Sequence, residues 1–166
     1  MTVLVLVGAY LIDPARMDWS PAAAVSATLG FLVVFWILYD LICRIVGQRK
    51  NGDAIVGALV AVLVVAASWL ACQWFAGRAA FLLVGAMIAT AMSANVFFWI
   101  IPGQRKVVAA MTSGKTYDPM EMAIHGKRGK QRSVHNTYFT LPVLFAMLSN
   151  HYSFLYTHEK HWLILL

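Results

Sequence analysis

The chain has 166 residues, of which 61% are hydrophobic and only 12% carry a charge. Soluble domains are about 45–50% apolar and about 25% charged, so the composition excludes an ordinary soluble domain and indicates an integral membrane protein. The formal net charge of +6 would suit a nucleic-acid-binding protein, but the basic residues lie between apolar runs. We therefore expect the lipid bilayer as a partner, and no nucleic acid.

The apolar runs predict an all-α fold, a polytopic bundle of transmembrane helices. About four complete spans are expected, at 21–46, 54–76, 79–101 and 134–152, and each is long enough to cross the hydrocarbon core. Shorter apolar runs at 1–11 and 161–166 suggest a partial span at each end. Residues 1–166 are thus expected to form a single transmembrane domain, as a piece of a longer membrane protein.

The segments between the spans differ in charge, and this difference predicts the topology. Segment 44–53 has a net charge of +2 and segment 102–133 has one of +5. These two segments lie on the same side when the spans alternate, so both are expected in the cytoplasm. The less basic segments are expected outside, at 12–20, 77–78 and 153–160.

Segment 102–133 is interpreted as a basic cytoplasmic loop, although its part 104–113 can also extend the preceding helix. Gly114 and the pair Asp118–Pro119 favour breaks there. The run GKRGKQR at 126–132 has two interpretations. It is either a solvated anchor that attracts anionic lipid or a loop that binds an anion or substrate.

Polar residues inside the first and third spans need a structural or functional reason, because they are costly at membrane depth. Asp40 precedes Arg44 by one helical turn, which predicts an ion pair between them. Asn95 either forms hydrogen bonds between helices or lines a cavity. Cys43 and Cys72 lack a CxxC or CxxCH motif and are expected as buried small residues, so no metal site is predicted.

The last complete span carries the most unusual pattern, in 131-QRSVHNTYFTLPVLFAMLSNHYS-153. A histidine–asparagine pair lies near each end, and Pro142 can kink the helix between them. The two histidines would be about 24 Å apart along a helix, so they cannot share one metal ion. The two pairs are therefore two sites, or one site and one anchor. The catalytic candidates are His135, Asn136, Tyr138, Asn150 and His151.

A histidine in a span can bind haem, carry a proton or bind a metal, or simply form hydrogen bonds at the interface. His135 and His151 are the candidate cofactor ligands, and the candidate cofactor is a b-type haem. Such a haem normally needs a second histidine on a facing helix. The other complete spans contain none, so a second ligand is expected from outside this chain.

Two long runs resemble a known family: 129-GKQRSVHNTYFTLPVLFAMLSNHYSFLY-156 and 77-GRAAFLLVGAMIATAMSANVFFWIIPGQRKVVAA-110. They are similar to the membrane region, called the urate oxidase N-terminal domain, of the bacterial membrane-bound urate oxidases or urate hydroxylases. AYLIDP at 9–14 also fits, and the resemblance covers essentially the whole chain. The run IHGKR before GKQR departs from the family pattern and lengthens the basic segment.

The resemblance implies an inner-membrane enzyme that converts urate to 5-hydroxyisourate in purine breakdown. It further implies a cytochrome c domain outside the membrane, with a c-type haem, that follows the present chain and passes electrons on. Urate is an anion, and the candidate substrate-binding residues are Asn95, Lys130 and Arg132. Two other functions stay open, namely a haem- or quinone-linked subunit that only transfers electrons, and a transporter or scaffold.

Overall fold

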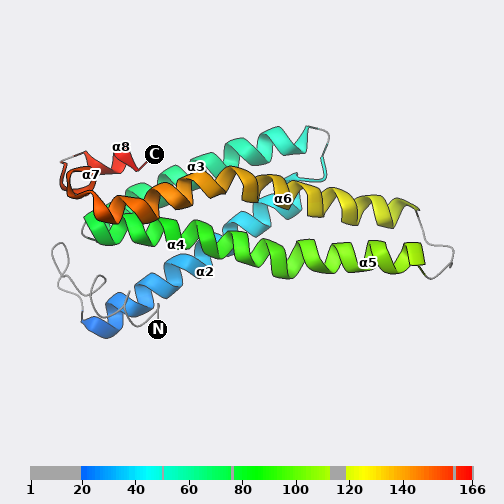
Figure 1. Ribbon diagram of the computed structural model, residues 1–166, viewed down its shortest axis with the longest axis horizontal. Coiled ribbons are helices and arrows are strands. Elements are labelled where there is room, and N and C mark those ends of the chain that lie inside the picture. Colours follow the sequence, from blue (N-terminus) through cyan, green and yellow to red (C-terminus); the bar gives the residue numbers. More distant parts are fainter. Residues whose placement is uncertain (1–19, 50, 76, 113–118, 159, 166) are drawn as a thin grey trace.

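The computed structural model describes residues 20–49, 51–75, 77–112, 119–158 and 160–165, and every regular element in these ranges is helical (Figure 1). The predicted all-α fold is therefore confirmed. The elements are α2 (Pro21–Val46), α3 (Gly52–Trp74), α4 (Gly77–Asn95), the π-helix η1 (Val96–Ile100), α5 (Ile101–Thr112), α6 (Pro119–Leu148), the 3₁₀ turn η2 (Ser149–His151), α7 (Ser153–Thr157) and α8 (His161–Ile164).

Three of these helices are long and apolar enough to cross a membrane: Ala22–Val46, Gly52–Trp74 and the continuous helix Gly77–Thr112. The expected fourth span, 134–152, is not confirmed as a complete one. Its apolar residues form only the second half of α6, whose first half is charged, and the α-helix ends at Leu148. The partial span at 1–11 lies outside the described residues, and the run at 161–166 contains only the short helix α8.

α2 begins at a capped N-terminus and separates an apolar outer face from a buried stripe. The Ser20 hydroxyl accepts a hydrogen bond from the backbone N–H of Ala23, and proline occupies the first helical turn. The buried stripe repeats every four residues, which places one side chain above the next; its members are Phe31, Phe35, Tyr39 and Cys43. Exposed leucine, valine and isoleucine side chains cover the opposite face, as expected for contact with lipid.

The turn between α2 and α3 packs tightly against α6. Asn51 adopts a left-handed conformation with a φ of 63°, which asparagine tolerates better than most residues. A Cβ atom at Gly47 would lie only 2.5 Å from the carbonyl oxygen of Cys43 and from the Gln131 amide. Gln131 also donates to Asp53 at 2.6 Å. Glycine at position 47 thus lets the α2–α3 turn sit directly against α6.

Segment 102–133 is not a simple loop, because most of it is helical. α4, η1 and α5 form one helix of 36 residues, about 54 Å long, which exceeds the hydrocarbon thickness of about 30 Å. α6 returns antiparallel to it, and the two helices extend beyond the α2–α3 turn (Figure 1). The proposed extension of the preceding helix over 104–113 is therefore correct up to Thr112.

α4 lies at the centre of the bundle and contacts α2, α3 and α6. Its small residues allow this close approach. At Gly85 an added Cβ would lie 3.0 Å from the Cβ of Ala146 in α6. The core around α4 is apolar and includes Ala80, Leu83, Val84, Met87, Ile88 and Ala91.

Candidate functional site

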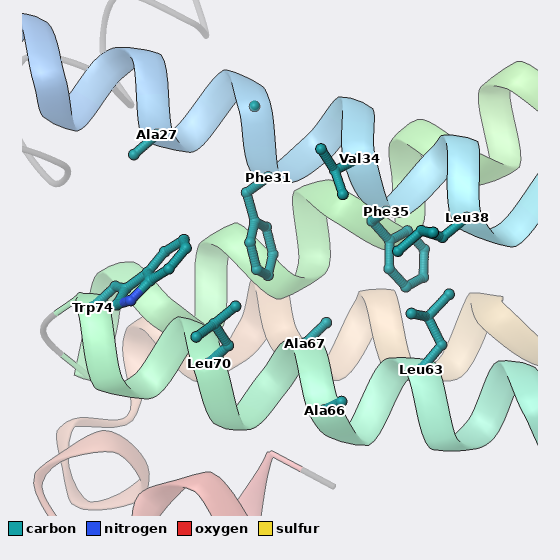
Figure 2. Close-up of a pocket in the computed structure, with 11 residues that line it drawn as sticks. Ala27, Phe31, Val34, Phe35, Leu38, Leu63, Ala66, Ala67, Leu70 and Trp74 are labelled. Atoms are coloured by element: carbon teal, nitrogen blue, oxygen red, sulfur yellow. The ribbon is translucent and has the colours of Figure 1, made fainter.

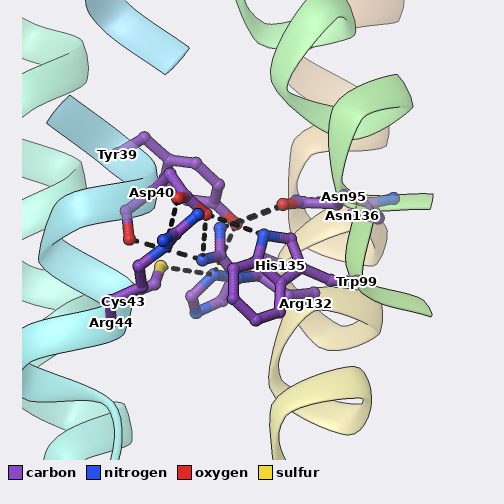
Figure 3. A network of polar contacts seen from close by, with 9 residues as sticks. All are labelled: Tyr39, Asp40, Cys43, Arg44, Asn95, Trp99, Arg132, His135 and Asn136. Atoms are coloured by element: carbon purple, nitrogen blue, oxygen red, sulfur yellow. Dashed lines mark hydrogen bonds and ion pairs between the residues drawn. The ribbon is translucent and has the colours of Figure 1, made fainter. Parts of the chain in front are cut away.

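Polar side chains from α2, α4–η1 and α6 meet where these helices converge, and Figure 3 shows them in contact. Seven come from two short stretches of helix, 39–44 of α2 and 132–136 of α6, and the other two are Asn95 of α4 and Trp99 of η1. The members are Tyr39, Asp40, Cys43, Arg44, Asn95, Trp99, Arg132, His135 and Asn136. We refer to these nine residues as the polar network.

A buried ion pair lies at the centre of the polar network. Arg132 is only 3% exposed, and its Nη2 lies 2.6 Å from Oδ1 of Asp40. The indole of Trp99 donates to the same oxygen at 2.8 Å, and Arg44 pairs with the other oxygen of the carboxylate. The predicted Asp40–Arg44 pair is thus confirmed, but Arg132 is the buried partner. A charge at this depth is tolerable because it is paired and hydrogen-bonded.

Aromatic rings enclose the Arg132 guanidinium. Its central carbon lies 4.9 Å from the centre of the Tyr39 ring and 5.2 Å from that of Trp99. Both distances suit cation–π attraction, which strengthens when the cation is shielded from water. The guanidinium is therefore held by charge, by hydrogen bonds and by ring faces together.

A directed chain of hydrogen bonds runs from Arg132 to His135. Arg132 Nη1 donates to Asn95 Oδ1 at 3.0 Å, and Asn95 Nδ2 donates to the Tyr39 hydroxyl at 2.9 Å. The Tyr39 hydroxyl lies 2.9 Å from His135 Nδ1. Because arginine can only donate, it fixes the orientation of the Asn95 amide. The Tyr39 hydroxyl accepts from Asn95 and also lies within hydrogen-bond distance of His135 Nδ1, so it links the amide to the imidazole.

Asn136 extends the polar network to the backbone of α4. Its Oδ1 accepts from Asn95 Nδ2 at 2.9 Å, and its Nδ2 donates to the carbonyl of Met92 at 3.1 Å. The π-helix begins directly after Asn95. Such turns insert one extra residue into a helix and are frequent at functional sites. Here the extra residue rotates α5 about the helix axis relative to α4, so the side chains of α5 point in different directions than in a regular α-helix.

The structure brings together four of the residues predicted from sequence: Asn95, Arg132, His135 and Asn136. It leaves Tyr138 out of the polar network, since this side chain is 75% exposed. Together with His135, Tyr138 lines a cavity of about 370 Å³ between α3 and α6. Lys130 lies outside the polar network too, and it lines a groove between α5 and α6.

The second histidine–asparagine pair lies at the other end of α6. The Asn150 side-chain oxygen accepts a hydrogen bond from Arg78, near the start of α4, whereas His151 is exposed. The pair thus forms no part of the polar network. The catalytic roles of both pairs and of Tyr138 remain predictions.

Sequence reasoning missed Tyr39 and Trp99, and it read Asp40 only as the local partner of Arg44. One signal was present, because Tyr39 continues the four-residue stripe that starts at Phe31. No comparable signal marks Trp99. Its indole reaches Asp40 from a helix 59 residues away in sequence, so only the folded chain reveals the contact.

Three of the described histidines each contact a different partner. His135 binds Tyr39 through Nδ1, while His125 contacts Lys106 and His161 contacts the backbone of His158. Over the described ranges, no three histidine, cysteine, aspartate or glutamate side chains gather in a way that could hold a metal ion. Haem binding through His135 or His151 stays a prediction that needs a ligand from elsewhere.

A further cavity lies between α2 and α3 (Figure 2). Its volume is about 460 Å³, and Phe31, Phe35, Leu63, Leu70 and Trp74 are among its lining residues. No charged side chain lines it within the described part of the chain. Such a lining suits an apolar occupant such as a lipid acyl chain, because a polar one would lose its hydrogen bonds to water.

Comparison with known proteins gives one match. No curated protein and no solved structure matches the chain. The family model described as "Urate oxidase N-terminal" matches residues 1–166, which is the family that the motifs around His135 and Asn95 indicate. The chain belongs to the urate oxidase N-terminal family.

Proposed function

We propose that this chain forms the membrane part of an enzyme that oxidises urate to 5-hydroxyisourate in purine catabolism. Membership of the urate oxidase N-terminal family supports a urate-related role. The observation that carries the proposal is the buried Arg132, which is linked to His135 through Asn95 and Tyr39. A membrane anchor needs no such chain, and buried ionisable groups in spans usually mark functional sites.

The proposed reaction removes two electrons and adds the oxygen atom of water. One urate monoanion and one water molecule yield one 5-hydroxyisourate, one proton and two electrons. The electrons pass to a c-type cytochrome, either a domain that follows this chain or a separate protein. The enzyme must therefore receive a proton from the reacting water and provide an exit for electrons.

His135 is suited to the proton step. A histidine near neutrality can take up a proton and release it again. Tyr39 holds the ring of His135 in one orientation through Nδ1, while Asn136 and Arg132 offer an amide and a positive charge close by. These groups would favour the negative charge that develops on the attacking oxygen. Asn150 and His151 lie at the far end of α6, on the side proposed for the cytochrome.

The proposed location is the bacterial inner membrane, with segment 44–53 and the α5–α6 hairpin in the cytoplasm. The basic residues of the α5–α6 end support this orientation through the positive-inside rule. Urate from cytoplasmic purine breakdown would then reach the same end of the bundle as the polar network. A label introduced on the hairpin should be reached by reagents only after the membrane is permeabilised.

The function can be tested with membranes that contain the full-length protein. We expect urate-dependent reduction of cytochrome c, with formation of 5-hydroxyisourate, and its loss in His135→Ala. His151→Ala tests the other end of α6, and His158→Ala, at an exposed position, serves as the matched control. Full activity in both His135→Ala and His151→Ala would rule out these site assignments. A b-type haem spectrum without urate turnover would instead favour an electron-transfer subunit, and urate uptake without oxidation would favour a transporter.

A further inference from the structure

A groove of about 580 Å³ lies between α5 and α6, outside the polar network. Its polar lining consists of Gln104 from α5 with His125, Lys130 and Ser133 from α6. These side chains offer a positive charge, an imidazole, an amide and a hydroxyl. The volume lies within the range of about 300–1,000 Å³ that is usual for small-molecule sites.

The charge around this groove favours an anionic ligand. Within Ile101–Thr112 and Pro119–Leu148 the acidic residue is Glu121, which lies 3.5 Å from His125. The same two helices carry several further basic residues outside the polar network, namely Arg105, Lys106, Lys127, Arg128 and Lys130. Lys106 lies 3.3 Å from His125, so positive charge borders the groove on both helices. A field of one sign raises the local concentration of a ligand of opposite charge.

Three glycines keep the groove open. A Cβ added at Gly126 or Gly129 would meet no heavy atom within 4 Å, and one at Gly103 would meet only the carbonyl oxygen of His125, at 3.6 Å. The walls therefore have free space where side chains would otherwise stand. A methyl group at position 126 or 129 would therefore enter open space.

The groove does not share a face of α6 with the polar network. Lys130 and Arg132 point about 200° apart around α6, which puts the groove and the network on different faces of one helix. A ligand in the groove would therefore not have to replace any hydrogen bond of the polar network.

We infer that the α5–α6 groove is a capture site at which urate, as a purine-type anion, binds before it reaches the catalytic groups, with Lys130 facing its negative charge; this assignment rests on the proposed function. Urate carries both N–H donors and carbonyl acceptors on its ring edges. The Gln104 amide and the Ser133 hydroxyl each donate and accept, and so they match both kinds of group. The phosphate of a lipid headgroup offers acceptors only, which uses fewer of these side chains.

Binding of radiolabelled urate to the purified full-length protein tests this assignment. Lys130→Gln removes the charge, and Gly129→Leu fills the groove; each is expected to weaken urate binding at least tenfold. Gly30→Leu is the matched control, because Gly30 lines the α2–α3 cavity and its added Cβ also meets nothing within 4 Å. We expect Gly30→Leu to bind urate like the unchanged protein.

Steady-state kinetics distinguish binding in the groove from the chemical step at the polar network. In Gly129→Leu the KM for urate should rise while kcat stays close to its original value, because the polar network is untouched. If urate binds but both groove variants bind it normally, the assignment of the groove is wrong and the proposed function survives. Loss of binding in Gly57→Leu alone would move the site to the cavity beside His135.

Two other results would also overturn the inference. If the unchanged protein does not bind urate, the groove is not a urate site. Urate turnover in membranes tests the proposed function separately. Displacement of bound urate by vesicles of phosphatidylglycerol, but not of phosphatidylcholine, would identify the groove as a headgroup site. The expected result is that neither lipid competes.

Discussion

Arg132 in α6 and Asp40 in α2 are 92 positions apart in sequence, yet their side chains form a buried ion pair at 2.6 Å. Both residues are less than a tenth exposed. Each charge makes the burial of the other tolerable, so the pair constrains how α6 can rotate and slide against α2. Since His135 is one turn further along α6, the pair also positions the imidazole beside Tyr39.

The ion pair predicts an unequal effect of its two single substitutions. Asp40→Leu leaves the buried Arg132 without its carboxylate and should lower the free energy of unfolding by about 3–5 kcal/mol. Arg132→Met should cost less, because Asp40 keeps Arg44 and Trp99 as partners. Unfolding in a detergent titration measures both. The double substitution should recover most of the loss, and a simple sum of the two single effects would contradict this pairing.

Tyr39 and Tyr138 offer a matched pair of tyrosine-to-phenylalanine substitutions. Tyr39→Phe removes the hydroxyl that joins Asn95 to His135. We expect it to cost about 1–3 kcal/mol of stability and to lower kcat for urate, because the imidazole loses its fixed orientation. Tyr138 is mostly exposed, so Tyr138→Phe should leave stability nearly unchanged. Equal effects of the two substitutions would show that the hydrogen-bond chain has no special role.

The helical fold and much of the candidate site could be predicted from the sequence, for separate physical reasons. Apolar runs report helices directly, because every backbone polar group in lipid must be satisfied within the segment. The polar residues in these runs were conspicuous for the same reason, and Asn95, His135 and Asn136 proved to be neighbours. Arg132, which was expected in the basic segment 102–133, joins them. Long apolar segments therefore carried information on both fold and site.

Contacts that depend on rotation about a helix axis could not be predicted. The π-helix after Asn95 has no recognisable sequence signal, yet it sets the direction in which Trp99 points. The start of α6 within segment 102–133 was also hidden, because its charges resemble those of a loop. Lys130 and Arg132 are two residues apart in sequence, and only the helical geometry of α6 separates them into a groove and a buried network.

The π-helix predicts a difference between removing a residue and removing its side chain. Phe97 lies in this turn and is 68% exposed, so Phe97→Ala should leave stability and activity nearly unchanged. Deletion of Phe97 should restore a regular α-helix and rotate α5 by about 100° relative to α4. The bond from Trp99 to Asp40 and the pairing of α5 with α6 would then be lost. Thermal unfolding and urate turnover compare the two variants, and similar behaviour would mean that the extra residue has no role in the site.

α4 packs closely on α6 where Gly85 faces Ala146. Moving one methyl group from Ala146 to Gly85 tests this contact. Gly85→Ala would place a Cβ 3.0 Å from that of Ala146, which forces the helices apart and should cost about 1–3 kcal/mol. Ala146→Gly should be destabilising too, through loss of packing and of helix propensity. The double substitution returns a single methyl group to the interface, so it should be more stable than the sum of the single effects predicts. Gly30→Ala, where the added Cβ has open space, should not destabilise the protein. Unfolding free energies of the four variants decide whether this helix contact holds α6, and with it His135, against the core.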